Sequence, residues 1–263
     1  MRAYVFKRTA LLLLACIGTA FGESSLPSGY GTSKELCIQG SCITNTSYWR
    51  GGAGGEYGDM SGSKKQTTSP FIGVKYRGVS GYNGKELMQT SVGLRYLSVE
   101  RNSARLGGYD TRGNKSNGVD GSVSIGLNIR PNSPRTPLFI NALYSVEYIY
   151  DTSLLHFMGA ELEGFLIATP KLRYEYALGY SRYIAGGYRL SQVPSVRLEG
   201  SSDMIHINLT LAYALTARTH CYVKAYGKIR NLAQSNSFEY NGADTRISAQ
   251  KQYFAGLELG LGF

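Results

Sequence analysis

The chain has 263 residues, among them 33 Gly and 21 Tyr, and a formal net charge of +10. Glycine at this frequency disfavours helices, whereas tyrosine is common in strands and at membrane interfaces. Beyond the first residues, no stretch approaches the roughly 18 continuous apolar residues of a membrane-spanning helix, so helical membrane proteins are excluded.

Residues 1–22 have the pattern of an export signal. A cationic start precedes a short apolar core at Ala10–Ile17, and a small-x-small cleavage site ends at Gly22. A second interpretation stays open, because the residues before Cys16 also resemble a lipoprotein cleavage box. We favour ordinary cleavage, which removes three cations and lowers the net charge from +10 to +7. An exported basic chain is expected to meet anionic lipopolysaccharide or anionic solutes, not nucleic acid.

Residues 23–46 are polar and carry Cys37 and Cys42 close together. We interpret this stretch as a periplasmic N-terminal segment, in which an oxidising compartment favours a disulfide between the two cysteines. Further metal ligands are lacking nearby, so no metal site is expected. Cys221 stays unpaired, and its position in the alternating pattern places it on an apolar strand face.

Ten segments then alternate apolar and polar residues with the period of a strand. They are Ser47–Gly58, Phe71–Gly78, Glu86–Glu100, Val119–Arg130, Leu138–Tyr150, Leu154–Ala168, Lys171–Ile184, Asp203–Leu215, Thr219–Arg230 and Tyr253–Phe263. Most reach or exceed the roughly 9–11 residues with which a tilted strand crosses a bilayer. The sequence therefore predicts an all-β fold, a transmembrane antiparallel meander β-barrel over residues 47–263.

The connections between these segments alternate in length. Short turns fall at Pro131–Thr136, Thr169–Pro170 and Thr216–Arg218, and long polar stretches at Arg101–Gly118, Ala185–Ser202 and Asn231–Gln250. Short periplasmic turns and long external loops are typical of outer-membrane barrels. The short connection Asp151–Ser153 is an exception, because it should be external. Counting back from the C-terminus favours ten strands, and an eight-stranded barrel starting at Glu86 is the alternative.

The last strand carries a distinctive apolar face that ends on the terminal residue. Its members are Tyr253, Leu257, Leu259, Leu261 and Phe263. This ending resembles the C-terminal strand of small outer-membrane β-barrel proteins of Gram-negative bacteria, the OmpA-like and porin-like barrels. The resemblance covers roughly residues 47–263 and identifies no subfamily. It implies a location in the cell outer membrane, and recognition of the terminal strand by the machinery that inserts such barrels.

The polar faces of the strands carry charges of both signs, with no helix to cover them. In a membrane barrel these faces line the lumen, while the apolar faces meet lipid. The expected lumenal residues are Arg50, Glu56, Lys75, Arg77, Arg95, Asp120, Arg130, Glu147, Glu161, Glu163, Arg173, Glu175, His206, Lys224, Lys228 and Glu258. Buried charges are costly unless paired, so we expect cross-lumen ion pairs. The charged lumen predicts either a structural polar core or a narrow solute path that is gated by the ion pairs.

The long stretch Arg101–Gly118 is basic. It carries Arg101, Arg105, Arg112 and Lys115 against Asp110 alone. Such a loop suits contact with lipopolysaccharide phosphates or an acidic host glycan, which makes a surface adhesin the alternative function.

A rim enzyme is the third hypothesis, and the sequence argues against it. Asp203 and His206 resemble the acid–histidine pair of omptin proteases, but a spacing of three puts them on opposite faces of a strand. Lipid-hydrolysing barrels need a Ser two residues from a His, and position 208 holds Asn. We therefore expect no catalytic site and no cofactor. The leading hypothesis is an integral outer-membrane barrel with a structural role or a narrow pore for small solutes.

Overall fold

The computed structural model describes residues 32–38, 41–60, 66–101, 104–106, 109–111, 115–150, 152–190, 193–240 and 242–263. The predicted export signal and both of its cleavage alternatives lie outside these residues. Over the described ranges, no helix is long and apolar enough to cross a membrane.

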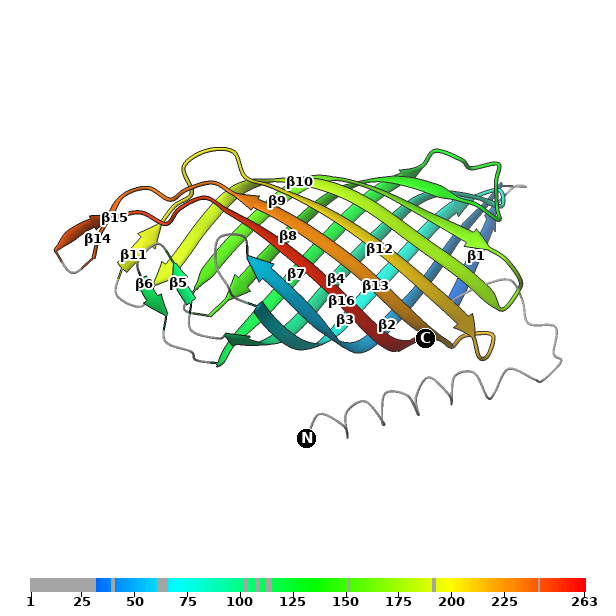
Figure 1. Cartoon of the computed structure of the whole chain (residues 1–263). Coiled ribbons are helices and arrows are strands. Elements are labelled where there is room, and N and C mark those ends of the chain that lie inside the picture. Colours follow the sequence, from blue (N-terminus) through cyan, green and yellow to red (C-terminus); the bar gives the residue numbers. More distant parts are fainter. Residues whose placement is uncertain are drawn as a thin grey trace, which may run out of the picture.

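Ten antiparallel strands of the described chain close into a barrel (Figure 1). They are β2 (Ser41–Met60), β3 (Gln66–Tyr82), β4 (Lys85–Arg101), β7 (Lys115–Asn128), β8 (Leu138–Ile149), β9 (Ser153–Ile167), β10 (Leu172–Leu190), β12 (Asp203–Ala214), β13 (His220–Leu232) and β16 (Gln250–Gly262). Neighbours in sequence pair with one another, and β16 pairs with β2 to complete the ring. The ten-stranded prediction is confirmed, and the eight-stranded alternative is wrong because β2 and β3 belong to the wall.

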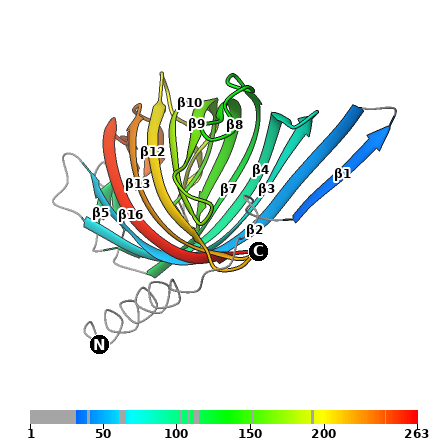
Figure 2. The same cartoon turned by 90° about the vertical axis from the view of Figure 1, so that its right-hand side faces the viewer.

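The remaining strands lie at the two ends of the barrel. They are β1 (Thr32–Ile38), β5 (Ala104–Leu106), β6 (Tyr109–Thr111), β11 (Val193–Val196), β14 (Phe238–Tyr240) and β15 (Ala243–Thr245). β1 pairs with the first residues of β2, most of which also pair with β3, and it lies at the outer edge of the strands in Figure 2. The structure thus extends regular strand pairing back into the segment expected to precede the barrel.

The lengths of the connections between strands identify the two ends of the barrel. The C-terminus lies at the end opposite β5, β6, β11, β14 and β15, which sit in the long connections (Figure 1). The short connections at the C-terminal end include a two-residue turn, Asn83–Gly84, whose φ values of 48° and 75° suit the tight hairpin turns that favour Asn-Gly. Following the rule that outer-membrane barrels have short periplasmic turns, we call this the periplasmic end and the other the extracellular end.

The outer face of the barrel is apolar and exposed. Large hydrophobic side chains are exposed on every barrel strand, for example Ile72, Leu94, Leu178 and Leu257. A soluble protein cannot leave such a continuous apolar surface in water, whereas a closed barrel satisfies its backbone and can stand in lipid. The strands have 12 to 20 residues, enough to cross a bilayer. The fold is therefore a transmembrane barrel.

Glycine residues occupy much of the inner face of the terminal strand β16. Gly256, Gly260 and Gly262 lie directly opposite the rings of Tyr226, Tyr222 and His220 on β13. A Cβ atom on Gly260 would lie 2.7 Å from the Tyr222 ring. The alternation of β16 therefore serves both faces: its odd positions meet lipid, and its glycines leave room for rings in the lumen.

An apolar cluster packs at the extracellular end. It contains Leu155, Phe157, Tyr188, Val196, Leu198, Met204, Leu232, Phe238 and Ile247. Backbone hydrogen bonds join the connection after β10 to the connection after β13, as in Glu199 N to Gln234 O at 2.7 Å. These two long connections thus pack on the barrel mouth as an ordered structure.

Candidate functional site in the barrel lumen

A first layer of charged side chains crosses the lumen near the periplasmic end. The Arg50 guanidinium on β2 makes a bidentate pair with Glu175 on β10, and Arg173 lies 2.7 Å from the same carboxylate. Arg77 on β3 lies 3.0 Å from Glu163 on β9. β2 and β10, like β3 and β9, are separated by three strands even along the shorter way round. These pairs therefore join opposite walls, and we call this set the periplasmic layer.

Amide side chains complete the periplasmic layer. Gln89 Nε2 donates to Glu163 Oε2 at 2.7 Å and to Asn141 Oδ1 at 2.8 Å, and Arg77 donates to the Gln89 carbonyl oxygen. Arg77 and Gln89 are only 2% and 1% exposed, and Asn141 is fully buried. Solvent therefore does not reach these side chains, and the layer is dry.

Aromatic rings cover the guanidinium groups of the periplasmic layer. The Phe165 ring centroid lies 4.1 Å from Arg77 Cζ and 5.2 Å from Arg173 Cζ, within the range of cation–π contacts. The Tyr48 hydroxyl accepts hydrogen bonds from Arg77 and Arg173, each at 3.3 Å. Arg50 Nε also donates to His220 Nε2 at 3.0 Å. Each arginine thus has several partners.

A second layer crosses the lumen nearer the extracellular end, and we call it the extracellular layer. Glu147 on β8 accepts from Lys228 Nζ at 2.7 Å and is paired with Arg230, both on β13. β8 and β13 are also separated by three strands along the shorter way round the barrel. The Phe254 ring lies 4.8 Å from Lys228 Nζ and 4.6 Å from Arg230 Cζ.

A neighbouring cluster on β2, β4, β7 and β13 extends the extracellular layer. Arg95 Nη2 donates to Asp120 Oδ2 at 2.6 Å and lies 3.8 Å from Glu56. The Tyr226 hydroxyl donates to Glu56 Oε2 at 3.0 Å. These contacts link four strands of the wall around one side of the lumen.

A cavity of about 210 Å³ lies in the lumen and touches both layers, and we call it the chamber. Lys75 and Lys224 line it, together with small polar side chains such as Ser91, Ser124 and Thr210. Lys224 Nζ lies 3.5 Å from Glu258, and Lys75 Nζ lies 4.0 Å from Glu163. Both pairs are longer than those of Arg77 with Glu163 at 3.0 Å and of Lys228 with Glu147 at 2.7 Å.

The structure places the expected lumenal residues together, apart from one. Arg130 lies exposed beyond the end of β7, because the strand stops at Asn128, so its placement in the lumen was wrong. The lumen contains further residues that the sequence analysis did not select: Tyr48, Gln89, Asn141, Phe165, His220 and Arg230. Arg230 follows Lys228 in the alternation, so the pattern alone could have found it. The amides and rings were missed because only charges were sought.

The basic loop residues cannot be placed in a site. Arg101 ends β4, Arg105 lies in β5 and Lys115 begins β7, but their side chains lie outside the described residues. Arg112 lies outside them entirely. Their contact with a ligand stays a prediction.

The histidines that could suggest an enzyme have other partners. His206 Nε2 lies 2.8 Å from Glu161 Oε2 in the lumen, whereas Asp203 accepts a hydrogen bond from Asn231 at 2.7 Å. On the outer face, His156 Nδ1 lies 2.6 Å from the Tyr144 hydroxyl. Neither arrangement supplies a serine nucleophile beside a histidine.

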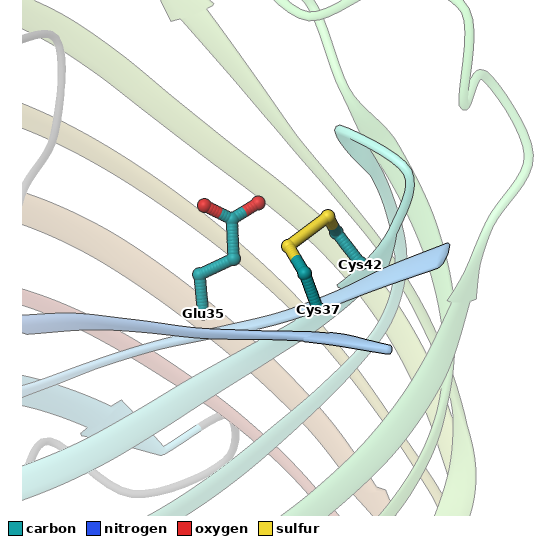
Figure 3. A group of neighbouring side chains, drawn as sticks. All are labelled: Glu35, Cys37 and Cys42. Atoms are coloured by element: carbon teal, nitrogen blue, oxygen red, sulfur yellow. A yellow bond between two sulfur atoms is a disulfide. The ribbon is translucent and has the colours of Figure 1, made fainter. Parts of the chain in front are cut away.

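The cysteine pair lies in the β1–β2 hairpin. Cys37 and Cys42 form the predicted disulfide, and the Glu35 carboxylate points to the same side (Figure 3). The potential ligand atoms of the three residues lie within 4.8 Å of one another. Both sulfurs are used in the disulfide, so this group offers no thiolate ligands in this state.

The closed ring, its apolar outer face and its charged lumen together decide the class of this protein. The chain is an outer-membrane β-barrel protein. The exposed residues of its terminal strand, Tyr253, Leu257, Leu261 and Phe263, face outward, with Leu259 partly exposed between them. Their recognition by insertion machinery stays a prediction.

Neither protein-family models nor curated proteins match this outer-membrane barrel in sequence. Its fold is similar to the outer membrane protease OmpT from Escherichia coli, with a TM-score of 0.48 and 10% identity over 82% of this chain and 96% of that chain. It is also similar to the translocator domain of the autotransporter NalP from Neisseria meningitidis (TM-score 0.37, 11% identity, 100% and 96% covered). A third similarity is to the outer membrane channel DcaP of Acinetobacter baumannii (TM-score 0.27, 13% identity, 89% and 69% covered). None of these likenesses indicates an activity for this chain.

Proposed function

We propose that this outer-membrane barrel contains a narrow pore for small solutes that is closed at rest. The observation that carries the proposal is the periplasmic layer, in which Arg77, Gln89 and Asn141 are almost completely buried at the centre of the barrel. A barrel of this size has an interior that side chains can fill. The layer supports a resting state without a continuous water path.

The chemistry of the periplasmic layer favours a pore that can open over a lumen that is permanently filled. Buried ion pairs are often no more stabilising than apolar residues of similar volume. An apolar filling would lose its stabilisation on contact with water, whereas guanidinium and carboxylate groups can exchange their partners for water. The pairs between Arg50 and Glu175 and between Arg77 and Glu163 therefore suit a gate.

The partners in this proposal follow from the location. The outer face meets outer-membrane lipids and lipopolysaccharide, and the lumen meets small solutes. The exposed apolar side chains on all barrel strands support the first. The chamber supports the second, because charged and hydroxyl side chains are among its lining residues and it is too small for a drug-sized ligand.

Single-channel recording tests the closed pore. Purified wild-type protein in a planar bilayer should be silent, whereas the double variant Arg77→Ala/Gln89→Ala should give stepwise currents, because it removes two large buried side chains from the periplasmic layer. Arg130→Ala is the matched control, since it removes an exposed arginine at the same end and should stay silent.

Two results would contradict the proposal. Steady conductance by the wild type would mean that the layer does not close the lumen. A silent double variant, shown to be folded by heat-modifiable migration on a gel, would mean that the periplasmic layer is not the gate.

A further inference from the structure

We infer that the chamber binds a small oxyanion, of the size of phosphate or a short carboxylate, between the ammonium groups of Lys75 and Lys224. This inference rests on the proposed closed pore, because the two layers give the chamber its ends.

The accessible charge in the chamber is positive. The Lys75 side chain keeps 40% of its surface exposed and the Lys224 side chain keeps 25%, although both lie inside the barrel wall. The most exposed carboxylate among the lumenal ion pairs is Asp120, at 16%, and Arg95 holds it at 2.6 Å. A solute that enters the chamber therefore meets ammonium groups more readily than carboxylates.

The carboxylates beside the two lysines already have shorter partners. Glu163 lies 3.0 Å from Arg77, compared with 4.0 Å from Lys75. Glu258 accepts from the Tyr222 hydroxyl at 2.5 Å, compared with 3.5 Å to Lys224. Both lysines can thus turn to another anion without leaving a buried carboxylate unpaired.

The balance of charge in the lumen points the same way. Eight cations and seven carboxylates take part in the described ion pairs of the lumen, where Glu161 is counted although its partner is His206, which is left aside. The cations are Arg50, Lys75, Arg77, Arg95, Arg173, Lys224, Lys228 and Arg230, and the carboxylates are Glu56, Asp120, Glu147, Glu161, Glu163, Glu175 and Glu258. One bound anion would therefore balance the charges of these side chains.

The two ammonium groups also act on each other. The ammonium groups of Lys75 and Lys224 repel each other electrostatically across the lumen, because like charges interact more strongly where water is scarce. An oxyanion between them would replace this repulsion with two charge-assisted hydrogen bonds. Thr210 and whichever of Ser91 and Ser124 accepts the hydrogen bond between them each keep a hydroxyl proton that can be donated to further oxygens.

The size of the chamber limits the ligand. Its volume of about 210 Å³ exceeds the roughly 30 Å³ that a water molecule occupies in the liquid, so an oxyanion and several waters fit. It lies below the roughly 300–1,000 Å³ of pockets for drug-sized ligands. The site therefore suits a compact anion and excludes nucleotides or sugars of several rings.

Titration of the purified barrel with inorganic phosphate tests the inference. In detergent without phosphate groups, calorimetry or ³¹P line broadening should show saturable binding of one phosphate per chain, competed by sulfate. Lys75→Gln/Lys224→Gln should weaken this binding at least tenfold, because both point charges are removed. Lys85→Gln is the matched control: it removes an exposed lysine beside the β3–β4 turn and should leave binding unchanged.

Folding of each variant is checked by heat-modifiable migration. If the double variant does not fold, the single variant Lys75→Gln replaces it, since the ion pair described for that side chain is the long one to Glu163 at 4.0 Å. The inference is overturned if the wild type shows no saturable phosphate binding, or if folded glutamine variants bind as the wild type does. Binding of calcium in place of phosphate also overturns it, because the carboxylates would then form the site.

The conductance and binding experiments separate the two proposals. A wild type that binds phosphate but conducts steadily would contradict the closed pore and leave the oxyanion site standing. A wild type that neither conducts nor binds phosphate would contradict the oxyanion site and leave the closed pore standing.

Discussion

In both layers two cations share one carboxylate, but in the periplasmic layer Arg50 and Arg173 also donate hydrogen bonds to His220 and Tyr48. In the extracellular layer Lys228 and Arg230 share Glu147, and the further contact described for both is with the Phe254 ring. Arg77 illustrates the first arrangement: it contacts Glu163, Gln89, the Tyr48 hydroxyl and the Phe165 ring. The second arrangement has aromatic cover from Phe254 but no amide side chain comparable to Gln89 among the contacts described for Glu147.

The difference shows two ways of keeping charges inside a narrow barrel. A network with redundant hydrogen bonds tolerates the loss of one member, because the remaining groups stay satisfied. Where two cations share one carboxylate and no further hydrogen bond is described for either, the loss of that carboxylate leaves two buried charges unpaired. The periplasmic layer is thus expected to resist single substitutions better than the extracellular layer does.

The largest effect is expected from Glu147→Gln. It leaves Lys228 and Arg230 without a carboxylate, and uncompensated buried charge destabilises by about 3–5 kcal/mol. Urea unfolding of the barrel in detergent measures this loss. Glu199→Gln, an exposed carboxylate at the same end, is the control and should stay near wild type. A loss below about 1 kcal/mol for Glu147→Gln would contradict the proposed dependence on one residue.

A smaller effect is expected from Glu175→Gln in the periplasmic layer. The new amide can still accept one hydrogen bond, Arg50 keeps His220 at 3.0 Å, and Arg173 keeps Tyr48 at 3.3 Å. We expect a loss of about 1–3 kcal/mol in the same unfolding experiment. If Glu175→Gln is as damaging as Glu147→Gln, the redundancy of the periplasmic layer is refuted.

The smallest effect is expected from Tyr48→Phe. This change removes one hydroxyl, which accepts from Arg77 and Arg173, and keeps the ring beside Arg50 at 5.0 Å. The expected loss is about 1 kcal/mol, typical of a single hydrogen bond. Tyr57→Phe, on the exposed outer face, is the matched control and should change nothing measurable. Equal midpoints for the two variants would show that the Tyr48 hydroxyl does not support the layer.

The sequence alone determined the class of fold and the two faces of the wall. Alternation has a period of two in any strand, so Val123, Ile125 and Leu127 had to share one face whatever their neighbours were. The connection lengths then assigned the two ends of the barrel. These signals are local, which is why they can be read without coordinates.

Only the tertiary structure decided which lumenal groups meet. Arg50 and Glu175 are 125 residues apart, and Lys228 and Glu147 are 81 apart. Whether two such side chains touch depends on barrel closure, strand tilt and register, none of which is encoded in a single strand. Closure also brought β2 beside β16 and thereby placed Gly52 next to the Tyr222 hydroxyl.

The interior consists of layers and a chamber because the registers of ten tilted strands bring side chains from distant parts of the sequence together. The composition of each strand supplied the charges, and the ring decided their partners. For this reason the two faces of the wall could be predicted from the sequence, whereas the cross-lumen ion pairs and the chamber became visible only when the barrel closed.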